Sequence, residues 1–72
     1  MVVGIFRTNI STQQDKHTII EAVHNQFMIS SCTIDIEDCD RVMRVLPGTL
    51  PVTAHDVIHF VRSQGFDCDL LD

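Results

Sequence analysis

The chain has 72 residues, 44% of them hydrophobic and 21% charged, a composition that excludes a disordered or fibrous chain and predicts one small globular domain over residues 1–72. Ten acidic residues against five basic ones give a net charge of −5, which disfavours binding to nucleic acids and to anionic membrane surfaces. No apolar stretch approaches the roughly 20 residues of a membrane span, and the N-terminus lacks a basic leader, so we expect a cytoplasmic chain without membrane insertion.

The first half of the chain predicts a strand, a helix and a second strand. Residues 2–8, VVGIFRT, are mostly β-branched or aromatic, which indicates a strand that is apolar on both faces. Residues 11–27 place apolar side chains at helical spacing behind Ser11 or Thr12 as N-cap, which predicts an amphipathic helix. Apolar and polar residues alternate over 32–37, CTIDIE, and this pattern predicts a strand with one wet face. Its buried face would carry Cys32, Ile34 and Ile36.

The second half predicts a hairpin and then a second helix. Residues 38–41, DCDR, favour a turn, because aspartate side chains bond to the nearby backbone. Residues 42–46, VMRVL, then form the returning strand and would place Val42 on the open face of the sheet. Residues 53–64 predict a helix that begins at a Thr53 cap.

Further patterns mark the end of that helix and the last strand. Gly65 stands where a left-handed C-terminal cap belongs, and residues 66–71, FDCDLL, predict a fourth strand. The buried stripe of the helix would hold Ala54, Val57, Ile58 and Val61, and the buried face of the strand Phe66, Cys68 and Leu70.

The order of these elements predicts the fold class. A βαββαβ order with right-handed crossovers belongs to the α+β class and folds as a ferredoxin-like sandwich. We expect an antiparallel sheet of order 4-1-3-2 with two helices on one face. The other face stays open, and the second strand is an exposed edge.

Several segments resemble the heavy-metal-associated domains of copper chaperones and metal-pumping ATPases. They are HTIIEAV after the first loop, the central hairpin, and VRSQGFDC near the end. The chain is also similar to short uncharacterised bacterial proteins that carry an acid-cysteine-acid turn and a last strand reading Gly-Phe-x-Cys. The resemblance to heavy-metal-associated domains implies the fold and a non-catalytic binding role, whereas the similarity to the bacterial proteins implies no activity.

The functional motif of the resembled family is missing from this chain. In that family a Cys-x-x-Cys pair at the junction of first strand and first helix holds a soft ion such as Cu(I) or Zn(II). Depending on the register, the matching positions hold Thr12 and Asp15 or Gln13 and Lys16, and neither pair supplies a thiol. Two-coordinate copper binding at this junction is therefore not expected.

The three cysteines are odd in number and widely spaced, which predicts reduced thiols. Cys32 and Cys68 are expected as small core residues, with Cys32 at the end of the sheet opposite the junction. Cys39 stands in the turn among Glu37, Asp38 and Asp40, whose charges disfavour a thiolate but attract a divalent cation. Because the fold places Cys39 and Cys68 near the family's metal end, they are the candidate ligands of a displaced metal site.

A second candidate metal site is the histidine pair in HDVIH. His55 and His59 are four residues apart on the predicted second helix, a spacing found in zinc sites, and both face solvent. No third ligand accompanies them, so we expect only weak binding of Zn(II) or Ni(II). His17 and His24 on the first helix are given no role.

No catalytic motif is present. The sequence has no glycine-rich phosphate cradle and no serine with a positioned base, so no enzyme activity is expected. We expect a binding or interaction domain that contacts a protein partner or a second copy of itself, with no cofactor beyond weakly bound Cu(I) or Zn(II). The alternative is a small regulatory module, like amino-acid-binding ferredoxin-like domains, that dimerises or binds a small molecule through its sheet.

Overall fold

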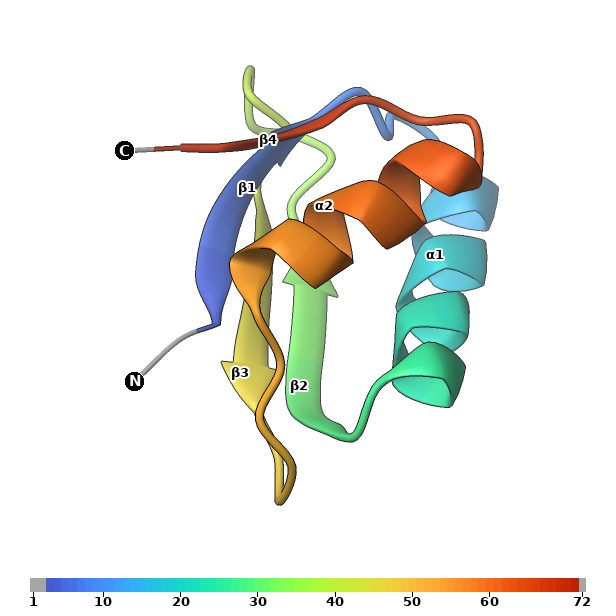
Figure 1. The fold of residues 1–72 in the computed structure, drawn as a ribbon. Coiled ribbons are helices and arrows are strands. Elements are labelled where there is room, and N and C mark those ends of the chain that lie inside the picture. The colour runs from blue at the N-terminus through green and yellow to red at the C-terminus, as the bar shows by residue number, and fades with distance from the viewer. Residues whose placement is uncertain (1–2, 72) are drawn as a thin grey trace.

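A computed structural model describes residues 3–71 of the chain (Figure 1). Residue 2, with which the expected first strand begins, and the terminal residues 1 and 72 lie outside the described range. The elements in chain order are β1 (Gly4–Thr8), α1 (Gln13–Gln26), β2 (Ile29–Ile34), β3 (Met43–Pro47), α2 (Ala54–Ser63) and β4 (Cys68–Leu70). This order is the βαββαβ order predicted from the sequence.

The four strands form one antiparallel sheet whose order is β2-β3-β1-β4. Read from the β4 edge, this is the order 4-1-3-2. Both helices lie on one face of the sheet (Figure 1), an arrangement compatible with a ferredoxin-like sandwich. The register places Phe6 of β1 between Met43 of β3 and Leu70 of β4.

The helices begin at the threonine caps that the sequence predicts. The hydroxyl oxygen of Thr12 accepts a hydrogen bond from the Asp15 amide, and that of Thr53 accepts one from the Asp56 amide, each at 3.1 Å. Such bonds satisfy amides that the first helical turn leaves free. Gly65 follows α2 with a φ of 94°, which confirms the left-handed cap, because an L side chain is strained there.

The core lies between the helices and the covered face of the sheet. Alternate residues of the strands point into it, since successive strand side chains lie on opposite faces. Its fully buried members are Phe6, Ile10, Ile19, Val23, Met43, Val45, Val57, Val61 and Cys68. On α2, Val57 and Val61 are buried as expected, whereas Ala54 and Ile58 are half-buried at the side of the stripe.

The predicted bounds of the second strand were wrong. β2 runs over Ile29–Ile34 instead of 32–37, so Cys32 lies within the strand, opposite Val45, and not at its start. The strand ends because the Asp35 carboxylate accepts a hydrogen bond from the Glu37 amide, which turns the backbone out of the sheet. Ile36 is half-buried and packs against the core from outside the strand.

The predicted four-residue turn is a longer connection over residues 35–42. Val42 consequently precedes β3, and its side chain is buried, so it adds no exposed apolar surface to the open face. β4 is also shorter than predicted, at three residues. Cys68 points into the core, but Leu70 is 49% exposed and Phe66 is half-buried before the strand begins.

The connections gather at two opposite ends of the sheet (Figure 1). The 35–42 connection lies at the end where β1 leads into α1, and the links from α1 to β2 and from β3 to α2 lie at the other. Among residues 3–71, no helix has the length and apolar character needed to cross a bilayer.

Candidate functional site

The 35–42 connection is shaped by its own aspartates. The Asp38 carboxylate accepts a hydrogen bond from the Asp40 amide at 2.8 Å, and the Asp38 carbonyl accepts one from the Arg41 amide at 3.0 Å. These bonds close a tight turn around Cys39. Arg41 leaves the turn with a φ of 45°, a conformation that is uncommon for a residue with a side chain.

Thr8 at the end of β1 anchors this turn. Its amide donates a hydrogen bond to the Asp40 carbonyl at 3.1 Å, and its hydroxyl donates one to the Arg41 carbonyl at 2.6 Å. The same hydroxyl oxygen accepts a hydrogen bond from the Ile10 amide at 3.3 Å. Because Thr8 is itself buried, these bonds offset the left-handed backbone at Arg41 and hold the turn against the sheet.

The turn brings three ligand-bearing side chains together. One ligand atom from each of Asp38, Cys39 and Asp40 lies within 4.8 Å of the others. Asp38 and Cys39 are exposed and Asp40 is half-buried, so a cation could reach the group from solvent. One thiolate and two carboxylates form a donor set that suits Zn(II) better than Cu(I), since Cu(I) prefers sulfur ligands alone.

Cys68, the other cysteine proposed from the sequence, does not join this group. It is fully buried in the core, and Cys39 is exposed. Burial raises the pKa of the Cys68 thiol to about 12 and that of the buried Cys32 thiol to about 11. Both are therefore neutral thiols near neutral pH, and their burial keeps them away from an ion that arrives from solvent. All three cysteines are free.

The junction between β1 and α1 carries structural side chains in place of the missing cysteines. The Thr12 hydroxyl is occupied as the N-cap of α1. The Asn9 side-chain oxygen accepts a hydrogen bond from the Asp67 amide at 2.8 Å and so ties the junction to the segment before β4. Hydrogen bonds thus hold the junction together. The exposed thiol at this end of the molecule is that of Cys39, on the neighbouring turn.

The histidine pair lies on the exposed face of α2, as predicted. The imidazole rings of His55 and His59 are stacked, with centroids 6.3 Å apart and ring planes 19° from parallel. His59 and Asp56 also line a hollow of about 400 Å³ between α2 and the end of α1. The rings of Phe27 and Phe60 also line this hollow, and they pack edge to face with centroids 5.6 Å apart.

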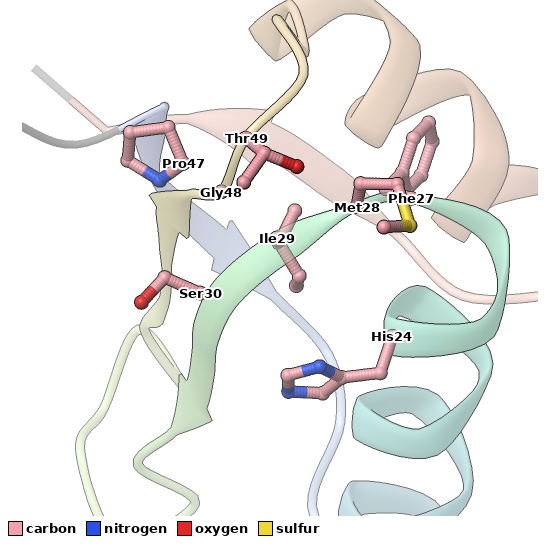
Figure 2. A pocket seen from close by; sticks show the side chains of 8 residues that line it. All are labelled: His24, Phe27, Met28, Ile29, Ser30, Pro47, Gly48 and Thr49. Carbon is pink, nitrogen blue, oxygen red and sulfur yellow. The ribbon is translucent and has the colours of Figure 1, made fainter.

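A further hollow, which the sequence analysis missed, lies at the end of the sheet away from the turn (Figure 2). Its volume is about 530 Å³, within the usual range for ligand pockets. The His24 ring extends from α1 toward β2, and Met28 is largely exposed beside it. The residues around the hollow are His24, Phe27, Met28, Ile29, Ser30, Pro47, Gly48 and Thr49.

The local sequence carries little signal for this hollow. It forms where the link from α1 to β2 meets the end of β3, and a Cβ atom on Gly48 would collide with the Met28 carbonyl. A glycine after the third strand and an apolar FMI run after the first helix are the only local hints. Their proximity depends on strand pairing between Ile29 and Pro47.

Comparison with protein-family models, curated proteins and solved structures gave no match for this chain.

Proposed function

We propose that this chain is a non-catalytic binding domain of the ferredoxin-like, heavy-metal-associated type, in which cation binding has moved from the β1–α1 junction to the neighbouring turn. The observation that carries the proposal is the grouping of the Asp38, Cys39 and Asp40 ligand atoms within 4.8 Å. The ion best suited to this set is Zn(II), bound through the Cys39 thiolate and the two carboxylates. Water or a partner would complete its coordination.

Charge and backbone geometry both favour this position. The net charge of −5 attracts cations to the chain as a whole, and the two acids concentrate that attraction at the turn. The turn is fixed by its bonds to Thr8, so the three ligands need little reordering when an ion arrives. A bound cation would also offset the negative charges of Asp38 and Asp40 at the turn.

The test is a calorimetric titration of Zn(II) into the reduced protein, with amide NMR signals used to locate the bound ion. We expect shifts centred on residues 38–40. Removing an outer-shell partner of a metal already costs roughly 10–100-fold in affinity. Cys39→Ser and Asp38→Asn, which remove direct ligands, should therefore weaken binding at this site at least as much.

The matched control is Asp35→Asn, which makes the same charge change in the same connection but outside the ligand group. It should leave Zn(II) affinity within about twofold of the unmodified chain. The proposal would be contradicted if Cys39→Ser bound Zn(II) at residues 38–40 as tightly as the unmodified chain. Equal losses of Zn(II) affinity in Asp35→Asn and Asp38→Asn would also contradict it.

A second candidate function is a regulatory module that associates through its sheet. Two observations favour it: β2 is an edge strand without proline, lysine or any other charged residue, and the open face presents the apolar side chains of Ile5 and Leu46. An edge without charges or proline is a template for pairing with another strand, here beyond the irregular register between Ile29 and Ser31. Association of two copies through this surface would leave the turn at residues 38–40 free.

A further inference from the structure

We propose that the pair His55 and His59 forms a second cation site on the exposed face of α2, with Asp56 placed to bond to a water on the ion, and that it takes a borderline divalent ion such as Zn(II) or Ni(II). The site lies outside the turn at residues 38–40 and uses no thiol. It does not depend on the function proposed for that turn, and each site can be removed separately.

Helix geometry brings the three side chains to one side of α2. At about 100° per residue, His59 falls between His55 and Asp56, and all three lie within an arc of about 100°. The α2 cap at Thr53 and the burial of Val57 and Val61 hold this segment of helix against the core. The ligands are therefore carried on a rigid element and not on a loop.

The spacing of the two rings suits a shared ion. Zinc lies about 2.0–2.1 Å from a ligating imidazole nitrogen, which sets the centroids of two ligating rings about 5–6 Å apart. The rings of His55 and His59 are already stacked at 6.3 Å. Both side chains are exposed, so rotation about their side-chain bonds can turn one nitrogen of each toward a common ion.

The adjoining hollow provides space for the water molecules that a two-histidine site needs. Asp56 and His59 both line it, and its volume of about 400 Å³ has room for the water molecules that complete the coordination. The Asp56 amide is bonded to the Thr53 cap, but within residues 3–71 no hydrogen bond or ion pair engages its carboxylate. That carboxylate can accept a hydrogen bond from a water bound to the ion.

The experiment is a Zn(II) titration of the Cys39→Ser variant, which lacks the thiol of the turn, followed by NMR of the imidazole ring signals. We expect the rings of His55 and His59 to shift together with one saturation curve. His17 and His24, both exposed on α1, are internal controls and should shift far less. Equal movement of all four rings, or none, would overturn the proposal.

Single variants then identify the ligands. In the same background, His55→Ala and His59→Ala should each weaken Zn(II) binding by at least about tenfold, since loss of even an outer-shell partner has roughly that effect. His17→Ala is the matched control and should leave the affinity unchanged, although His17 lies 3.3 Å from the Glu21 carboxylate in its own four-residue pair. An equal loss in the His17 variant would overturn the assignment.

Acidic pH provides an independent readout. A protonated imidazole cannot ligate a metal, so Zn(II) binding to the Cys39→Ser variant should weaken when the solution is made acidic. Binding that persists there would assign the ion to carboxylates instead of the histidines. Far-ultraviolet circular dichroism confirms that each variant is folded, which the exposure of both rings leads us to expect.

Discussion

At the scale of single residues, the three cysteines differ in chemistry because they differ in burial. Cys39 is exposed on an acidic turn, whereas Cys32 and Cys68 are buried in the core. Desolvation is the largest cause of the raised pKa at both buried thiols. At Cys68 the Arg62 guanidinium opposes the shift, and the Asp69 carboxylate and Cys32 thiol add to it. Only Cys39 is thus available for ligation or thiol chemistry in the folded chain.

The buried thiols predict a loss of stability at alkaline pH. Their pKa values are raised from 9.0 to about 11 and about 12, so the folded chain keeps protons that the unfolded chain releases. This contribution to the free energy of unfolding is fully present below about pH 8.5 and is lost as the pH rises toward 11 or 12. Urea unfolding at a series of alkaline pH values measures the slope.

Two alanine variants separate this effect from other titrations. Cys68→Ala should be less stable at all pH values, because it leaves a small cavity, but its stability should fall less steeply with pH. Cys32→Ala removes the other buried thiol and should flatten the slope in the same direction. Identical slopes in all three proteins would contradict the prediction.

At the scale of elements, the link between β2 and β3 depends on the end of β1. The Thr8 hydroxyl bridges the Arg41 carbonyl and the Ile10 amide, and so joins the acidic turn to the segment that enters α1. The two segments are separated by more than twenty residues in sequence. The position of Cys39 and its neighbouring acids is therefore set by a strand that contributes no ligand.

This bridge predicts that Thr8→Val is destabilising although the two side chains have nearly the same shape. Valine leaves the buried Ile10 amide and Arg41 carbonyl without their partner, which costs about 1–3 kcal/mol of the free energy of unfolding. Thr8→Ser keeps the hydroxyl and loses one methyl group, a cost of about 0.8 kcal/mol. Urea unfolding compares the two variants.

Amide NMR provides a second comparison of the Thr8→Val and Thr8→Ser variants. Signals of residues 38–41 should move in Thr8→Val and stay near their original positions in Thr8→Ser. A valine variant as stable as the serine variant, with an unchanged turn, would show that the hydroxyl does not hold the connection.

At the scale of the whole molecule, the helices cover one face of the sheet and leave the other to solvent (Figure 1). Apolar and charged side chains alternate across the open face. Ile5 pairs with Arg44, and Arg7 pairs with Asp69. Leu46 on β3, next to the edge strand, is 37% exposed. The open face thus has apolar side chains that a partner could bury, and charged side chains that could set the partner's orientation.

Association through this face predicts a mass near twice 8.1 kDa in light scattering at high concentration. Leu46→Gln should shift the protein toward the monomer, because it removes apolar surface without changing the charge. Leu50→Gln is the control, since Leu50 is 56% exposed but lies in the link after β3 and not on the sheet. A protein that is monomeric at every concentration would remove the second candidate function.

Much of the fold follows from local patterns. Thr12, Thr53 and Gly65 mark helix ends through bonds and backbone angles that involve only neighbouring residues. The sequence predicts Thr53 and Gly65, and for the first helix it leaves the choice between Ser11 and Thr12 to the structure. Strand bounds were less predictable. CTIDIE alternates through residue 37, but the side-chain bond of Asp35 ends β2 three residues earlier.

The candidate sites also divide into those that local sequence predicts and those that depend on distant segments. The histidine pair on α2 could be recognised from spacing alone, because helix geometry sets which residues are neighbours. The separation of Cys39 from Cys68 and the hollow beside Gly48 could not, since each depends on how distant segments pack.

The amino-acid sequence by itself determined the order of the elements, the helix caps and the spacing of His55 and His59, because local hydrogen bonds and periodicity dictate them. Only the tertiary structure decided that Cys68 does not join Cys39 in one ligand group, and that Thr8 holds the acidic turn. Burial and long-range hydrogen bonds arise when segments far apart in the chain are brought together, and no local pattern records them.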